Sequence, residues 1–359
     1  MGRLAALSSA MNSPLLLMLW PALLGAQGSF TRLGTPAAYP TGISADGTIV
    51  VGARSNFGPA FRWTAADGVV NIGGVGFQAR ISRDGKTIVS DANDSNGLAN
   101  AAIWQGGTNW KVLGGIPGGQ PSGPYLSSAW DVSADGSVVV GLAWLTPGIA
   151  HGFRGDAKNG MTDLGGLQGR STRASVVSAD ANVIAGFDED PLAYNHNNWR
   201  GAAWWQSLER LLNPFGWIGV ANAINNDGSV IVGTGTPVNT RHAYRYTAAD
   251  GHIEDLGALP RGLTPSGQQQ EDQSSAAGVS DDGNVVVGIS GYRPPTDAMI
   301  WTPATKMVKL NDYLTSKGIT GFDGWSLIGA TGVTPDGKTI IGTGINPAGL
   351  VEGFVVKLP

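Results

Sequence analysis

The chain has 359 residues, of which 42% are hydrophobic, so it holds enough apolar material to bury a large core. Fifty-five glycines and twenty prolines beside only 14% charged residues favour short strands joined by tight turns over long solvated helices. The net charge of −4, without any run of lysine or arginine, argues against a nucleic-acid partner, and the lack of cysteine excludes disulfides.

The beginning of the chain has the pattern of a secretory signal peptide. Arg3 precedes an apolar run over 14–24, and the small residue Ala26 follows. The run has about half of the ~20 apolar residues that cross a bilayer. We therefore expect a cleaved signal peptide over 1–26 and a single domain over 27–359 with no membrane span.

Secretion without cysteine is typical of bacterial export. We expect a monomer in the periplasm or outside a bacterial cell, with no lipid anchor, because such an anchor needs a cysteine directly after the signal. Met1 and Met11 are equally suitable start residues, since the apolar run follows both.

A repeat then organises the chain, and its first copy is ISADGTIVVG from Ile43. Asp-Gly between two β-rich runs predicts a tight hairpin, because glycine takes the positive φ of the turn and the aspartate side chain bonds to nearby backbone. The aspartates of the seven copies are Asp46, Asp84, Asp135, Asp180, Asp227, Asp282 and Asp336.

Each unit contains two further strands. The third ends in an aromatic residue, as in AFRW over 60–63 and AYRY over 243–246, and the fourth ends in Leu-Gly or a variant, as at Leu256. We expect the repeated aromatic residues to pack between blades, and they are Trp63, Trp104, Trp205, Tyr246 and Trp301. Intervals of 38 to 55 residues between the aspartates fit a four-stranded blade. The sequence thus predicts an all-β fold, a seven-bladed β-propeller with four antiparallel strands in each blade.

The two ends of the chain complete each other. The last unit stops at GFVVKLP over 353–359 without a fourth strand, and the segment FTRLGTP over 30–36 resembles the missing strand. We expect the N-terminal strand to pair in the last blade, which closes the ring and removes two exposed sheet edges.

The unit resembles that of the extracellular HAF-repeat proteins of bacteria, in which an S-x-D-G-x-x-V-V-G hairpin is followed by A-F-x-W and D-L-G. The resemblance covers Phe30 to Pro359. It implies a secreted or surface-exposed propeller, and it supplies no catalytic residue.

The connections between repeats differ in length on only one face of the predicted ring. The Asp-Gly turns are short and share one face, whereas the long connections 117–127, 188–201, 261–275 and 311–326 lie on the other. Because scaffolds place binding residues on variable loops, we take this variable face as the candidate functional face.

The connection 188–201 contains more kinds of side chain suited to ligand binding than the other connections. Its carboxylates, histidine and aromatic rings are suited to gripping a sugar, or they form a solvated acidic loop with Trp199 packed against its own blade. The candidate ligand-binding residues are Tyr194, His196, Trp199 and Arg200 of this loop, and Trp144 and Trp325, which lie outside the repeated aromatic position.

Arg80 and Asp131 interrupt a series of small or apolar residues on the innermost strands. A charge near the axis needs a partner or water, so the two residues either form a structural ion pair or line a polar site in the channel.

Metal chemistry has little support in the sequence, because four scattered histidines and no cysteine give no zinc spacing. Asp91, Asn93 and Ser95 begin like a calcium loop, but glycine at the sixth position and glutamate at the twelfth are missing. A structural calcium ion is the one cofactor that the sequence suggests.

Two functions follow. The first is a non-enzymatic propeller that binds an extracellular glycan or protein through its variable face. The alternative is a polysaccharide hydrolase or lyase with carboxylates in the axial funnel, since a propeller can assemble such groups from several blades. The candidate catalytic residues are Asp131, Asp188, Glu189, Asp190 and Asp323.

Overall fold

The computed structural model describes residues 27–34, 38–54, 58–76, 78–167, 169–189, 199–205, 208–211, 218–237, 240–262, 267, 271–291 and 296–359. For 199–205 and 208–211 the description is confined to the backbone. The expected signal peptide over 1–26 lies outside the described residues.

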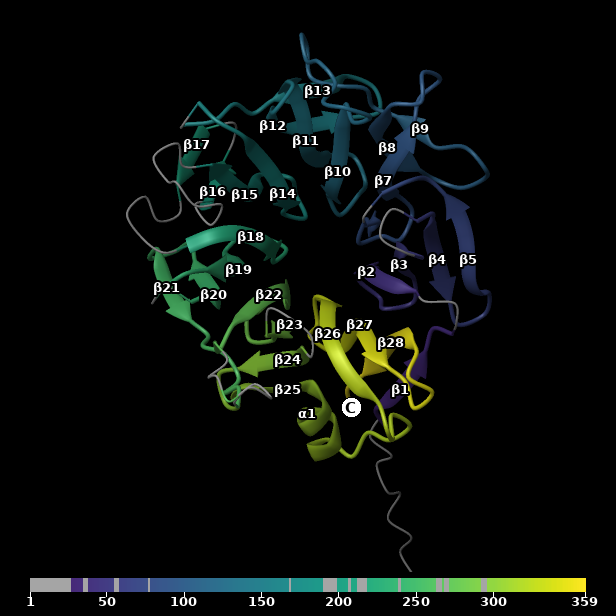
Figure 1. Cartoon of the computed structure of the whole chain (residues 1–359), viewed down its shortest axis with the longest axis vertical. Helices are drawn as coiled ribbons and strands as arrows, with labels where there is room; N and C mark the ends of the chain where they lie inside the picture. Colours follow the sequence, from purple (N-terminus) through teal and green to yellow (C-terminus); the bar gives the residue numbers. More distant parts are fainter. Residues whose placement is uncertain are drawn as a thin grey trace, which may run out of the picture.

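The described residues form seven four-stranded antiparallel sheets, the arrangement that the sequence repeat predicts. The sheets stand radially around a central axis, so the fold is an all-β propeller and each sheet is a blade (Figure 1). The innermost strands are β2 (Tyr39–Ile43), β6 (Arg80–Ile81), β10 (Ser127–Val132), β14 (Thr172–Val177), β18 (Ile218–Ile224), β22 (Ser274–Val279) and β26 (Ser326–Val333). The second strands are β3 (Val50–Ala53), β7 (Ile88–Asn93), β11 (Val139–Thr146), β15 (Val183–Glu189), β19 (Val230–Gly235), β23 (Val286–Ser290) and β27 (Thr339–Ile345).

Two outer rows complete the blades. The third strands are β4 (Ala60–Thr64), β8 (Ala99–Trp104), β12 (Ile149–Asp156), β16 (Trp199–Trp205), β20 (His242–Thr247), β24 (Asp297–Thr302) and β28 (Val351–Lys357). The outermost strands are β5 (Gly68–Gly73), β9 (Lys111–Val112), β13 (Gly160–Asp163), β17 (Leu208–Leu211), β21 (His252–Asp255), β25 (Lys306–Lys309) and β1 (Ser29–Arg32).

The N-terminal strand closes the ring, as predicted. Strand β1 pairs antiparallel with β28, so the last blade takes its outermost strand from the other end of the chain (Figure 1). The buried carboxylate of Glu352 fixes this junction, because it accepts hydrogen bonds from Arg32 Nη2 at 2.8 Å and from the backbone N–H of Gly34 at 2.9 Å. Burial opposes ionisation of Glu352, but these bonds outweigh it and hold its pKa below the usual value.

Each Asp-Gly pair forms the tight turn between the first and second strands of a blade. In the first blade, Asp46 Oδ1 accepts hydrogen bonds from Ser44 Oγ at 2.6 Å and from the N–H of Thr48 at 3.0 Å. In the fourth blade Ala181 takes the place of glycine, with φ of 58°. Equivalent side-chain and backbone bonds recur in the other turns, which explains the Ser/Thr and Asp positions of the repeat.

A β-bulge explains the glycine that ends the repeat. Every innermost strand except the short β6 carries a bulge at an equivalent point. The bulge presses a carbonyl oxygen against the second strand, and a Cβ on Gly233 would lie 1.9 Å from the oxygen of Val220. In the second blade Ser90 replaces the glycine, and its hydroxyl donates to the carbonyl of Gln78 at 2.7 Å.

The aromatic residues of the third strands hold neighbouring blades together. Trp63 packs with Ile341 and Val355 of the last blade, and Trp301 packs with Val232 of the preceding blade. The prediction of inter-blade packing is confirmed for these residues. The fourth blade requires a correction, because Ile184 pairs with Trp204, which places Trp204 and not Trp205 at the repeated register position.

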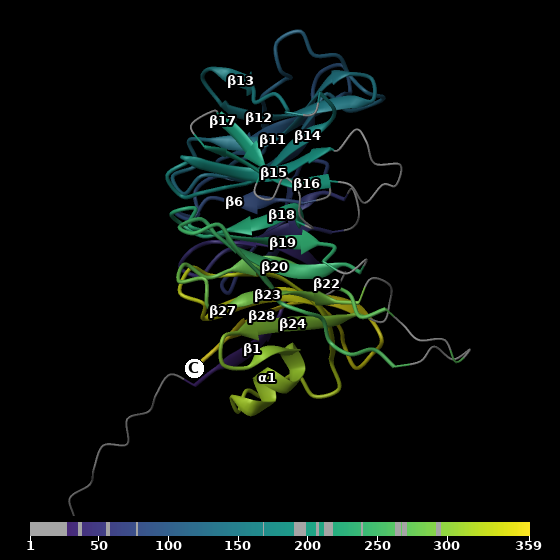
Figure 2. The same cartoon turned by 90° about the vertical axis from the view of Figure 1, so that its left-hand side faces the viewer.

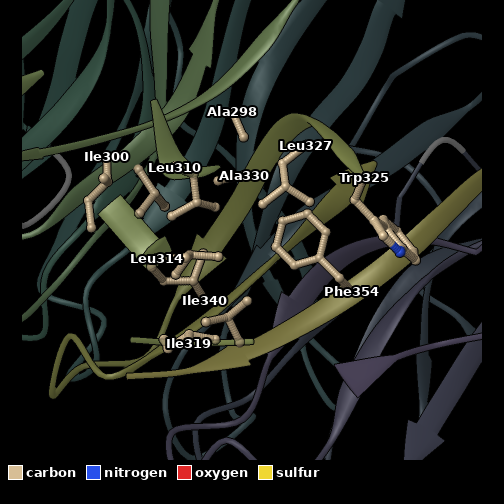
Figure 3. Packing of buried hydrophobic residues seen from close by; sticks show 12 residues of the cluster. Ala298, Ile300, Leu310, Leu314, Ile319, Trp325, Leu327, Ala330, Ile340 and Phe354 are labelled. Carbon is tan, nitrogen blue, oxygen red and sulfur yellow. The ribbon is translucent and has the colours of Figure 1, made fainter. Parts of the chain in front are cut away.

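One element was not expected from the sequence, the helix α1 (Leu310–Ser316), which lies within the connection predicted as a variable loop over 311–326. Leu310, Leu314 and Ile319 are buried between the last two blades, beside Ala298, Ile300, Leu327, Ala330, Ile340 and Phe354 (Figure 3). The helix projects beyond the strands at the edge of the molecule formed by the sixth and last blades (Figure 2). None of the helices among the described residues is long and apolar enough to span a membrane.

Candidate functional site

A cavity of about 130 Å³ lies on the axis of the ring and is lined by the innermost strands of all seven blades. Turn residues Ala45, Arg83 and Pro335 also line it, so it occupies the end of the axis beside the Asp-Gly turns. Glycine or alanine at Gly42, Ala277 and other wall positions leaves this space open. The cavity therefore lies near the face opposite the one expected to be functional.

Arg80 and Asp131 meet in this axial cavity, as the sequence predicted. The Arg80 guanidinium donates from Nη1 to the carbonyl of Thr41, while its Nε is buried and has no hydrogen-bond partner in the protein. Asp131 Oδ2 accepts the backbone N–H of Val177 at 2.9 Å.

The two charges influence each other without forming a direct ion pair. Burial lowers the pKa of Arg80, and the charge of Asp131 opposes this effect. Burial raises the pKa of Asp131, and the charge of Arg80 opposes it. Of the two alternatives drawn from the sequence, the polar site in the channel agrees with this geometry, and the ion pair does not.

A second arginine crosses the end of the cavity. Arg83 belongs to the second blade, yet its Nη1 lies 3.7 Å from Oδ1 of Asp281 in the sixth blade. The side chain of Arg83 is 27% exposed. Asp281 also accepts the N–H of Asn226 at 3.1 Å, so its carboxylate contacts both Arg83 at the axis and the backbone of the fifth blade.

Backbone hydrogen bonds around the axis hold these turns in place. The N–H of Ala45 donates to Arg83 O at 3.0 Å, and successive bonds join the turns of the second to the fifth blades. Asp281 N–H donates to Pro335 O at 2.8 Å, which continues the circle into the last blade. Pro335 has no N–H, so the circle has no such bond back to the first blade.

The expected loop 188–201 is shorter than predicted, because β15 extends to Glu189 and β16 begins at Trp199. Asp190, Tyr194 and His196 lie outside the described residues, and Trp199 and Arg200 are described only as backbone paired with Glu189 and Asp188.

The two described carboxylates of this region have structural partners. Asp188 is buried, and its Oδ2 accepts the N–H of Leu167 at 3.0 Å. Glu189 Oε2 accepts the N–H of Ser171 at 3.3 Å. Both side chains therefore tie the connection before β14 to β15, and neither lines the axial cavity.

The tryptophans predicted near the variable face have different surroundings. Trp325 is only 7% exposed and makes an edge-to-face contact with Phe30 in the core of the last blade, which corrects its assignment as a surface ligand contact (Figure 3). Trp144 is half-buried near the end of β11. Asp323 lies exposed in the turn before Trp325 and is not among the residues that line the axial cavity.

The calcium-loop pattern has other partners in the structure. Asp91 is buried in β7, and its carboxylate accepts the N–H of Ala129 at 3.0 Å and the hydroxyl of Ser128 at 2.9 Å. Burial raises the pKa of Asp91 to about 7. Asn93 ends the same strand, and Ser95 lies in the exposed turn that follows. No cluster of three acidic or histidine side chains occurs among the residues that the structure describes.

Sequence reasoning missed two cavity residues, Arg83 and Asn222. The signal for Arg83 was present, because it stands directly before the Asp of the second repeat, where three other copies have alanine. Asn222 stands at the bulge of β18, and its amide donates to the carbonyl of Ala276 at 2.9 Å. A bulge has no local sequence signature here, so its inward-facing residue could not be identified.

Neither a protein-family model nor a curated protein matches this chain. Solved structures do resemble it. An oligogalacturonate lyase in complex with manganese is 16% identical, with a TM-score of 0.56 over 92% of this chain and 93% of that one. An oligogalacturonate lyase from Vibrio parahaemolyticus is 13% identical, with the same TM-score and coverage of 92% and 93%.

The β-propeller domain of the Trilobed protease from Pyrococcus furiosus is 11% identical, with a TM-score of 0.54 over 89% of this chain and 95% of that one. The chain shares the β-propeller fold with all three. That domain is described as having an open velcro topology, whereas here β1 pairs with β28. Because identity is low throughout, the likeness establishes the fold of this propeller and leaves its chemistry to the site itself.

Proposed function

We propose that this propeller is an exported, non-enzymatic binding protein that recognises a polar extracellular ligand, a glycan or a protein segment, in its axial cavity. The observation that supports it most is the convergence of polar side chains from different blades on a cavity where Arg80 Nε has no protein partner. Buried polar groups are nearly always hydrogen-bonded, so an unpaired donor on a side chain that lines the cavity favours a role in binding.

The charges of the cavity favour binding over glycoside hydrolysis. A glycosidase needs two carboxyl groups about 5–10 Å apart. Among the described residues that line the cavity, Asp131 is the only carboxylate, and arginines accompany it. Asp188, Glu189 and Asp323 do not line the cavity, so the candidate catalytic groups that are described do not converge.

The test is a glycan array and a protein pull-down with the purified mature protein, followed by turnover assays on acidic polysaccharides. Oligogalacturonate is included because it appears in the names of two structurally similar lyases. We expect saturable binding without turnover.

A cavity-filling variant locates the site. Ala277 lines the cavity, and Ala277→Leu should weaken binding about tenfold or more by filling it, whereas Ala157→Leu in an exposed turn should not. Failure to find any ligand, or turnover that Asp131→Asn abolishes, would contradict the proposed function.

A further inference from the structure

The charged residues of the axial cavity indicate which chemical group the ligand presents there. The described lining contains two cations, Arg80 and Arg83, and one anion, Asp131. Asp281 stands beside Arg83 at the end of the cavity, at a distance of 3.7 Å, too long for a close bidentate pair. Among the described lining residues the arginines therefore outnumber the carboxylate by one, and Asp281 faces Arg83 at the end of the cavity.

The guanidinium of Arg80 is held in place at one nitrogen and has a second nitrogen without a partner in the protein. Its Nη1 is anchored to the carbonyl of Thr41, and its Nε is buried without a partner. A guanidinium fixed at one end is pre-organised to donate to an oxyanion, because its donors form a rigid fork that matches carboxylate, sulfate and phosphate.

Small residues leave room for such a group next to Arg80. At the position equivalent to Arg80, four of the other six innermost strands carry a small residue, namely Gly42 on the adjacent strand β2, and Ala223, Gly278 and Gly332 across the ring. A cavity of about 130 Å³ holds an oxyanion and part of the molecule that carries it. Charge-assisted hydrogen bonds from an arginine to such a group are stronger than bonds between neutral groups.

We propose that the axial cavity binds the anionic group of an acidic ligand, a carboxylate, sulfate or phosphate, between Arg80 and Arg83. This inference rests on the proposed function and names the group that the binding site recognises. Asp131 is a neighbouring charge that helps to keep Arg80 protonated and repels the bound anion.

The test compares D-glucuronate with D-glucose by isothermal titration calorimetry, since the two sugars share a ring and differ in one carboxylate. D-Glucuronate should bind at least about tenfold more tightly, and its affinity should fall as salt is added. Inorganic sulfate and phosphate, titrated alone and as competitors, distinguish a general oxyanion site from a uronate site.

Four variants assign the effect to the cavity. Arg80→Gln should remove the preference for D-glucuronate, and Arg83→Gln, at a partly exposed position that the fold tolerates more easily, should reduce it. Arg62→Gln makes the same charge change near the rim of the first blade and should leave the preference unchanged. Asp131→Asn should strengthen anion binding several-fold, because it removes the repelling charge.

Equal affinity for the two sugars would overturn the inference and leave the proposed function standing if the array still finds a ligand. An unchanged preference in both arginine variants, or loss of anion binding in Asp131→Asn, would also overturn it. If neither D-glucuronate, sulfate nor phosphate binds, the anion site is wrong, and the array alone decides the proposed function.

Discussion

At the scale of single residues, close contacts determine which positions of the repeat are constant. The terminal glycine is required because a bulge on the innermost strand brings a carbonyl within 1.9 Å of the position of a Cβ at Gly233. The exception supports this explanation. The blade with Ser90 at that position has an innermost strand of only two residues, Arg80–Ile81.

Substitutions at these two positions should therefore differ. Gly233→Ala should cost about 3 kcal/mol or more in unfolding free energy, because the methyl group meets backbone that cannot move cheaply. Ser90→Gly should cost about 1–2 kcal/mol, from one lost hydrogen bond and added chain entropy. Urea denaturation measures both, and similar losses for the two variants would refute the bulge explanation.

The turn aspartates make the fold sensitive to acid. Hydrogen bonds from Ser44 and Thr48 lower the pKa of Asp46, and the pKa of the aspartate in each of the other six Asp turns is also below its usual value. A depressed folded-state pKa gives stability that is present above the unfolded value of about 3.9 and is lost as pH falls through the folded value.

We accordingly expect the contribution of these turns to the melting temperature to be lost as pH drops below about 4. Above that pH the raised pKa of Asp91 acts in the opposite direction and lowers the melting temperature as pH rises towards 7. Asp46→Asn should reduce the acid-dependent part of the loss. Thermal melts between pH 7 and pH 2.5 test this, and a melting temperature that does not change below pH 4 would contradict the assigned role of the turns.

At the scale of elements, the sequence predicted the strands, the turns and the closure, because each has a local pattern that repeats. It did not predict the bulges or helix α1. A bulge depends on backbone contacts with the neighbouring strand, and α1 has only Leu310 and Leu314 as buried residues in seven positions, too few for a helical period. The shift from Trp205 to Trp204 arises likewise from strand register, which a sequence pattern does not fix.

The closure is the element on which the ring depends most. Deleting 27–34 should lower the unfolding free energy by about 3 kcal/mol or more, since it removes β1, the buried Leu33 and the stacking of Phe30 on Phe354, and it exposes the edge of β28. Thermal denaturation against the chain that begins at Gln27 measures the effect.

A milder variant separates the strand from its anchor. Glu352→Gln keeps β1 but weakens the bonds from Arg32 and Gly34, so its loss should be smaller, about 1–2 kcal/mol. An unchanged melting temperature after the deletion would show that the ring does not need the N-terminal strand.

At the scale of the whole molecule, the seven blades bring side chains to one axis from positions far apart in the chain. Arg80 and Asp131 could be predicted, because each breaks a repeated position. The position of Arg83 opposite Asp281 could not be predicted, because it depends on how the second and sixth blades lie relative to each other across the ring. The sequence also did not indicate which side chains are exposed, since Trp325 lies in a variable connection yet is buried.

The crystal structure of the protein with D-glucuronate bound tests the central claim most directly. We expect the carboxylate of the sugar in the axial cavity, within hydrogen-bond distance of the Arg80 guanidinium and next to Arg83. D-Glucuronate ordered instead on the variable face near Trp144, with no sugar in the cavity, would contradict it.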